Sequence, residues 1–218
     1  MMNVEQARFN MVEQQIRPWD VLDFKVLDLL QLTPREAFVP KGYEELAFAD
    51  MEIPLDHDEI MLAPKMVARM MQAANIHESD VVFEVGTGTG YGTALLAKAA
   101  REVESVDIHP DFIETAKRNL AAQGIDNVSL DSRDAAQGVG SDKLYDVIII
   151  TGSLPSLPES FQQSLQRGGR LVAVVGTAPV METVLITRTG DNEWNQETLF
   201  ETEIPALRNV ETVKRFTF

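Results

Sequence analysis

Short apolar runs alternate with helical segments from residue 81 onward, and this pattern restricts the possible folds more than any other feature. The run YDVIIIT at 145–151 is nearly all apolar, which is typical of a central parallel strand buried on both faces. Strands that alternate with helices predict a mainly parallel sheet with helices on both faces. The expected strands cover 81–85, 103–108, 127–130, 145–151 and 170–176, and the expected helices cover 93–100, 111–123 and 158–166.

Two further apolar runs, 181–188 and 197–204, flank a turn signal at Gly190-Asp191-Asn192. Such a pair predicts antiparallel strands at the far end of the sheet. The fold class expected is therefore α/β: a Rossmann-like three-layer sandwich with a mostly parallel central sheet. An N-terminal helical extension precedes the sheet, and an antiparallel strand pair ends it.

The first 40 residues have helical patterns and no strand. A helix over 3–16 has Asn3 as its cap, and further helix starts are expected at Asp20 and Thr33. Residues 41–63 are irregular, and another helix runs from Pro64 to about residue 75. We expect one domain over 1–218, with 1–76 as the N-terminal part and 77–218 as the Rossmann-like core.

The composition argues against several classes of protein. With 34 acidic and 19 basic residues the net charge is −15, which repels phosphate backbones and anionic lipid, so neither nucleic acid nor a membrane is expected as a partner. The absence of cysteine excludes disulfides and zinc–thiolate sites, and three scattered histidines give no metal-ligand spacing. The polar start MMNVEQARFN is unlike a signal peptide, so a cytoplasmic location is expected.

A glycine-rich segment follows the first expected strand and precedes a helix. It reads Glu84-Val85-Gly86-Thr87-Gly88-Thr89-Gly90. Glycines in this context let the backbone turn tightly and approach a ligand closely, and the helix start offers bare N–H groups. The segment therefore predicts a ligand site at this end of the sheet.

Two acids stand at the ends of the next strands. Asp107 ends the second strand, where a carboxylate accepts the hydroxyls of an adenosine ribose. Asp134 follows the third strand, where a side-chain oxygen accepts from an adenine amino group. Because the carboxyl ends of parallel strands meet at one edge, both acids are expected beside the glycine loop.

The spacing of the glycines favours one cofactor. A dinucleotide fold has G-x-G-x-x-G, whereas here the third glycine comes two residues after the second and the acid Glu84 precedes the loop. S-adenosylmethionine carries a net positive charge, which acidic residues attract more than they attract a pyrophosphate. The expected cofactor is S-adenosyl-L-methionine, with S-adenosyl-L-homocysteine as its product. Its expected contacts are Glu84, Gly86, Thr87, Gly88, Gly90, Asp107 and Asp134.

The chain resembles protein-L-isoaspartate O-methyltransferases over nearly its whole length. The segments that carry the resemblance are MVEQQIRP (11–18), PREAFVP (34–40), FEVGTGTGYGTALLA (83–97), YDVIIITGSLPSLPE (145–159) and LQRGGRLVAVVG (165–176). The resemblance implies a class I methyltransferase that esterifies isoaspartyl carboxylates in damaged proteins, hence a protein or peptide substrate.

One segment departs from the family. The family's substrate segment reads roughly G-Q-T-I-S-x-P and its hydroxyls hold the isoaspartyl carboxylate; here 58–64 reads DEIMLAP. Ile60 and Leu62 replace the hydroxyl residues, and neither can donate a hydrogen bond. Asp58 and Glu59 add negative charge, which repels a carboxylate.

Three hypotheses follow from this mixture. The first is isoaspartyl methylation, and the second is methylation of a different acceptor, a small molecule included. The third is a module that binds the cofactor without transfer. A hydroxyl acceptor needs a general base, for which His57 and Glu59 are candidates. Leu62 and Thr151, the latter after the fourth strand, are the other candidate acceptor contacts.

Overall fold

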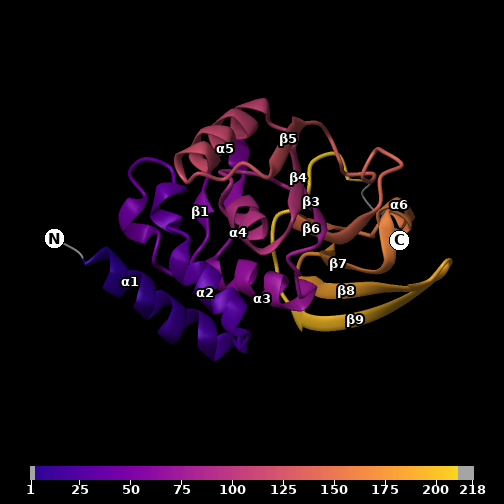
Figure 1. Ribbon diagram of the computed structural model, residues 1–218, viewed down its shortest axis with the longest axis horizontal. Coiled ribbons are helices and arrows are strands. Elements are labelled where there is room, and N and C mark those ends of the chain that lie inside the picture. The colour runs from indigo at the N-terminus through magenta and orange to yellow at the C-terminus, as the bar shows by residue number, and fades with distance from the viewer. Residues whose placement is uncertain (1–2, 211–218) are drawn as a thin grey trace, which may run out of the picture.

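A seven-stranded sheet forms the centre of the computed structural model, which describes residues 3–210 (Figure 1). The strand order is β5-β4-β3-β6-β7-β8-β9; neighbours from β5 to β7 are parallel, and β8 and β9 are antiparallel to their neighbours. The predicted α/β fold class is confirmed. The strands are β3 (Val81–Val85), β4 (Glu102–Asp107), β5 (Val128–Ser132), β6 (Tyr145–Leu154), β7 (Leu165–Thr177), β8 (Val180–Gly190) and β9 (Glu193–Glu201).

Two hydrophobic clusters, one on each face, bury this sheet. The larger cluster joins α3 (Pro64–Ala74), α4 (Tyr91–Ala99), α5 (Pro110–Ala122) and the N-terminal helices to sheet residues such as Val82. The smaller one surrounds Phe83 and Phe161, the latter on the short helix α6 (Glu159–Gln163). Because successive side chains of a strand point to opposite faces, Glu84 shares the α4 face with Val82.

The N-terminal segment is helical, as predicted, although its boundaries differ. α1 (Val4–Asn10) is capped by Asn3 and continues as a π-helical turn (Met11–Ile16) and a 3₁₀ turn (Arg17–Trp19). α2 (Phe24–Leu32) begins after Asp23, so the predicted start at Asp20 is wrong.

The side chain of Gln72 explains the later start of α2. Its amide accepts from the backbone N–H groups of Leu22 (2.7 Å) and Asp23 (2.9 Å) and donates to the Asp20 carbonyl (2.8 Å). These contacts hold the backbone outside a helix, and Asp20 is in the left-handed region at φ 61°. The third predicted start, at Thr33, leads only to a 3₁₀ turn (Arg35–Ala37).

The Asp23→Ala variant should lower the free energy of unfolding by about 1 kcal/mol, since the Asp23 carboxylate caps α2 by accepting from the Lys25 N–H (2.8 Å). Urea unfolding measures the difference. Asp28→Ala, at an exposed position inside the same helix, should cause no loss. Equal losses in both variants would contradict a specific cap at Asp23.

The irregular stretch before α3 contains a small hairpin that positions the expected substrate segment. β1 (Ile53–Pro54) pairs antiparallel with β2 (Ile60–Met61), and a 3₁₀ turn (Asp56–Asp58) joins them. His57 and Asp58 both have positive φ, 61° and 58°, so the chain reverses sharply. The turn brings Glu59 toward the carboxyl end of β4.

The remaining boundaries differ by a few residues. α6 is shorter than the predicted helix 158–166, because Leu165 already pairs with Tyr145 as the first residue of β7. β6 runs to Leu154 rather than 151, with an irregularity in its register after Ile149. Within residues 3–210 no helix is both long enough and apolar enough to cross a membrane.

Candidate active site

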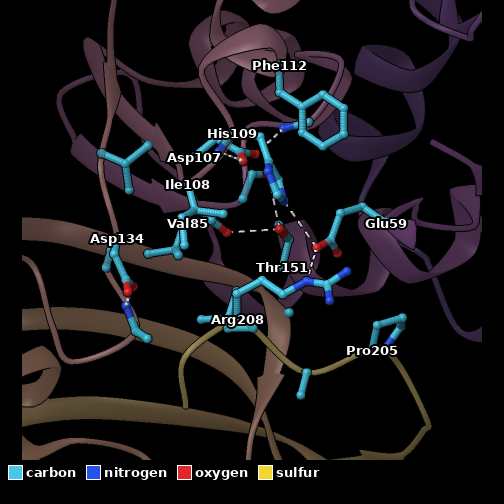
Figure 2. Close-up of a pocket in the computed structure, with 18 of the residues that line it drawn as sticks. Glu59, Val85, Asp107, Ile108, His109, Phe112, Asp134, Thr151, Pro205 and Arg208 are labelled. Atoms are coloured by element: carbon cyan, nitrogen blue, oxygen red, sulfur yellow. Dashed lines mark hydrogen bonds and ion pairs between the residues drawn. The ribbon is translucent and has the colours of Figure 1, made fainter. Parts of the chain in front are cut away.

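A pocket opens at the carboxyl ends of β3, β4 and β6, the edge at which the sequence places its ligand site (Figure 2). It spans about 700 Å³ of space, part of which is open solvent. Six of the candidate residues line it together: Glu59, Gly86, Gly88, Asp107, Asp134 and Thr151.

Asp107 is held rigidly at the end of β4. One carboxylate oxygen accepts from the Gly88 N–H (2.8 Å) and the other from the His109 N–H (3.0 Å), and the residue is only 8% exposed. Burial raises the pKa of Asp107, and these two hydrogen bonds counteract the rise. Each oxygen keeps a lone pair for a ligand hydroxyl. The Gly88 N–H is therefore used within the protein.

Asp134 forms the opposite wall of the pocket. One oxygen accepts from the Ala136 N–H (2.8 Å), and the other accepts from the side-chain amide of Asn209 (2.8 Å). The Asn209 amide offers the same kind of donor as an adenine amino group. A ligand amine that binds Asp134 therefore shares or replaces this hydrogen bond.

Gly86 and Thr151 are fitted to one another at the floor of the pocket. The Thr151 hydroxyl donates to the carbonyls of Val85 (2.9 Å) and Gly86 (3.1 Å). A Cβ atom on residue 86 would lie 2.1 Å from the Thr151 Oγ1, and Gly86 has φ of 96°. Position 86 therefore excludes every side chain.

Glu84, Thr87 and Gly90 do not line the pocket; the structure places them behind the loop. Glu84 is 1% exposed and accepts from the hydroxyls of Thr93 (2.5 Å) and Ser105 (2.6 Å). The Thr87 hydroxyl bonds to that of Ser105 (2.7 Å), and Gly90 packs against α5. These residues support the loop from beneath, whereas the glycine-rich motif predicts them in contact with the cofactor.

Burial raises the pKa of Glu84 to about 7, although the hydrogen bonds from Ser105 and Thr93 act in the opposite direction. As the pH rises from about 4.5, the unfolded chain loses this proton first, so stability falls until the folded-state pKa is reached. The loss amounts to roughly 3 kcal/mol between about pH 4.5 and 7. The Glu84→Gln variant should lack it, because an amide does not titrate; urea unfolding across this pH range measures the difference.

Glu114→Gln is the matched control, since Glu114 is an exposed acid on α5. Its unfolding free energy should follow the wild-type pH dependence. If Glu84→Gln also kept the wild-type pH dependence, the raised pKa of Glu84 would be refuted.

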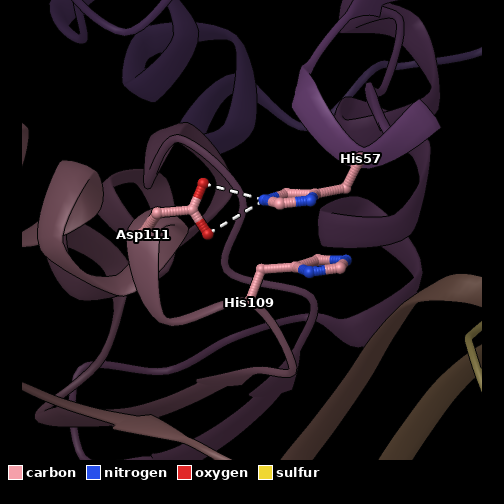
Figure 3. A group of neighbouring side chains, drawn as sticks. All are labelled: His57, His109 and Asp111. Carbon is pink, nitrogen blue, oxygen red and sulfur yellow. Dashed lines mark hydrogen bonds and ion pairs between the residues drawn. The ribbon is translucent and has the colours of Figure 1, made fainter.

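His57, His109 and Asp111 meet at the rim of the pocket (Figure 3). The rings stack with centroids 4.1 Å apart and planes 3° from parallel, and the His57 Nε2 lies 2.9 Å from the Asp111 carboxylate. One potential ligand atom from each residue lies within 4.8 Å of the others. A metal lies in the plane of each imidazole that binds it, so parallel stacked rings cannot share an ion unless one ring rotates. As it stands, the cluster is a stacked pair with a carboxylate partner.

Leu62, the other substrate-segment candidate, lies away from this pocket. It borders a separate, mainly apolar cavity together with Met70, Leu96 and Ile149. Thr151 borders both spaces. His57 does not line the pocket either. Its backbone carbonyl accepts a hydrogen bond from Arg208, which does line the pocket.

One wall of the pocket, the segment Pro205–Arg208, has no signal in the sequence. Ser153 at the end of β6 holds it by donating to the Pro205 carbonyl (2.8 Å) and accepting from the Leu207 N–H (3.0 Å). Arg208 then reaches Glu59, with its Nε 2.6 Å from the Glu59 Oε1 (Figure 2). These partners are far apart in sequence, so no local motif predicts them.

Comparison with known proteins identifies the family. A family model described as "Protein-L-isoaspartate(D-aspartate) O-methyltransferase (PCMT)" matches residues 6–210. The chain belongs to this family. A protein-L-isoaspartate O-methyltransferase of Methanoculleus marisnigri is 38% identical over 84% of this chain and 84% of its own length. A protein-L-isoaspartate O-methyltransferase of Methanospirillum hungatei is 36% identical over 84% of this chain and 85% of its own length.

Solved structures of protein-L-isoaspartate O-methyltransferases share the fold. One has a TM-score of 0.79 and 25% identity, over 91% of this chain and 65% of that one. A putative member from Plasmodium falciparum, solved with S-adenosyl-L-homocysteine, has a TM-score of 0.80 over 95% of this chain and 99% of that one, at 18% identity. The predicted family resemblance is confirmed.

Proposed function

We propose that this chain is an S-adenosylmethionine-dependent methyltransferase that esterifies isoaspartyl carboxylates in proteins or peptides, a protein-repair activity. The observation that carries the proposal is the joint placement of Gly86, Asp107 and Asp134 around one pocket in a member of this family. The relatives are named for this reaction.

The residues present fit the proposed cofactor. Asp107 and Asp134 offer acceptors on opposite sides of the pocket, suited to ribose hydroxyls and an adenine amine. Gly86 lines the same pocket, so its backbone can border the methionine part. Both acids also attract a ligand with net positive charge.

When bound, S-adenosylmethionine supplies a methyl group on a positively charged sulfur, and its transfer to a carboxylate leaves a neutral ester and a neutral thioether. The chain's own residues then have two tasks, to hold the reactants in line and to exclude water. Asp107 and Asp134 bind the adenosine part of the cofactor, and the segment Pro205–Arg208 forms one wall of the pocket. A carboxylate acceptor is already ionised at neutral pH, so no residue has to remove a proton.

The wider organisation forms part of the proposal. We propose that the chain forms a single domain. The supporting observation is that one hydrophobic cluster joins residues of the N-terminal helices to the sheet: Met11, Ile16, Leu30, Val82 and Val147. A cytoplasmic location is proposed from the lack of cysteine.

A direct test uses S-adenosylmethionine with a labelled methyl group and a pair of peptides that differ only in one aspartyl linkage. The expected result is a base-labile methyl ester on the isoaspartyl peptide and none on the aspartyl peptide. Cofactor binding with no ester on any isoaspartyl peptide would contradict the proposed acceptor. Methyl transfer to a hydroxyl compound in the same assay would replace the isoaspartyl carboxylate with a hydroxyl group as the acceptor.

A further inference from the structure

The charges that line the pocket raise a problem for an anionic acceptor. Glu59, Asp107 and Asp134 are all acidic, whereas the acceptor proposed above is itself a carboxylate. A carboxylate that leaves water stays ionised only if a positive group or hydrogen-bond donors replace its hydration. Two arginines line the pocket, Arg133 and Arg208, and their hydrogen bonds distinguish them.

Arg133 makes structural contacts through all three of its guanidinium nitrogens. Its Nε lies 3.0 Å from the Asp131 carboxylate, and its Nη2 donates to Glu104 (3.1 Å). Its Nη1 donates to the Val139 carbonyl, and the guanidinium packs over the Phe83 ring. Every guanidinium nitrogen of Arg133 thus already has a protein oxygen as partner.

Arg208 is held differently. Its Nε donates to Glu59 (2.6 Å) and its Nη2 to the His57 carbonyl (2.5 Å), while its Nη1 has no hydrogen-bond partner among residues 3–210. The side chain is 46% exposed, so the Nη1–Nη2 edge is accessible. This edge has the two parallel donors that a carboxylate accepts in a bidentate pair.

The same contacts explain the role of Glu59. Its Oε1 takes the Arg208 Nε and lies 3.4 Å from the His109 Nε2, so cationic and polar partners offset its charge. The sequence suggests an acid that repels the acceptor. The structure instead shows an acid that fixes the orientation of a guanidinium.

We propose that Arg208 recognises the acceptor carboxylate, in place of the hydroxyls absent at Ile60 and Leu62, with Glu59 as its positioning residue. This inference rests on the proposed function. Arg208 faces the pocket from the same side as Thr151 and Glu59, whereas Asp134 lies on the opposite side (Figure 2). The acceptor therefore enters on the Arg208 side, and the adenosine part of the cofactor is held between Asp107 and Asp134.

The test measures binding of two peptides to the protein saturated with S-adenosylhomocysteine. The peptides are identical except that one has the free isoaspartyl α-carboxylate and the other its α-carboxamide. Wild type should bind the carboxylate about 10- to 100-fold more tightly, the range expected of a charge-assisted pair. Arg208→Gln should bind both about equally, with its affinity for S-adenosylhomocysteine within about twofold of wild type. Arg208→Lys should restore part of the preference, because a point charge remains.

Arg101→Gln is the matched control, since Arg101 is exposed at the opposite end of β4. It should keep the wild-type preference. If Arg208→Gln also kept it, the role of Arg208 would be overturned while methyl transfer by wild type still supported the proposed function. A large loss of S-adenosylhomocysteine affinity with the preference intact would assign Arg208 to the cofactor instead. A wild-type protein that binds neither peptide contradicts both the acceptor and this role.

Discussion

The Gly86→Ala variant should bind S-adenosylhomocysteine with a Kd at least about 100-fold higher than that of wild type. Its free energy of unfolding should be lower by about 2–5 kcal/mol. The added Cβ would stand 2.1 Å from the Thr151 Oγ1 at a residue with φ of 96°. Either the loop or Thr151 has to move, and both border the pocket. Calorimetric titration and urea unfolding measure the two effects.

Two further variants distinguish the backbone strain of a positive φ from the steric clash between residue 86 and Thr151. Gly42 has nearly the same φ, 95°, but its Cβ would meet nothing within 4 Å, so Gly42→Ala should cost only the backbone strain and leave binding intact. Adding Thr151→Ala to Gly86→Ala removes Oγ1 and leaves the Cβ of residue 151 at 3.5 Å, an ordinary contact. This double variant should recover part of the lost stability. No recovery would contradict the collision as the cause.

The Asp107→Asn variant should weaken S-adenosylhomocysteine binding by about 100-fold. The amide has lost the negative charge that strengthens hydrogen bonds from the ribose hydroxyls, and one of its two polar atoms can no longer accept. Either the Gly88 or the His109 N–H also loses its acceptor, which shifts the loop. The measurement is calorimetric titration at neutral pH.

Asp111→Asn provides the comparison for Asp107→Asn. Asp111 lies four residues further along, is exposed and bonds to His57 at the rim rather than lining the pocket. Its S-adenosylhomocysteine affinity should stay within a few-fold of wild type. A similar loss in both variants would point to a general charge effect and not to a specific contact at Asp107.

The parts of the site that the sequence predicts are those fixed by local geometry. Parallel strands end at one edge, so the sequence alone places Asp107 and Asp134 beside the glycine loop. The apolar run of β6 identifies the centre of the sheet for a similar reason, because a strand buried on both faces has few polar residues. The alternation of side chains along β3 also indicates that Glu84 faces α4, where the hydroxyls of Thr93 and Ser105 bind it, and does not line the pocket.

The parts that the sequence does not predict depend on distant contacts. Both Asp20 and Asp23 can cap a helix, and the choice between them depends on Gln72, about 50 residues away. Arg208 meets Glu59 across 149 residues, and Asn209 meets Asp134 across 75. Neither pairing has a motif, because the residue types involved occur on any protein surface.

The central claim is that the pocket between Asp107 and Asp134 binds S-adenosylmethionine, and a crystal structure with S-adenosylhomocysteine tests it most directly. We expect the ribose hydroxyls within hydrogen-bond distance of the Asp107 carboxylate, the adenine beside Asp134, and the homocysteine part over Gly86. A crystal grown at saturating ligand concentration that shows this pocket empty, or the ligand bound elsewhere, would contradict the account.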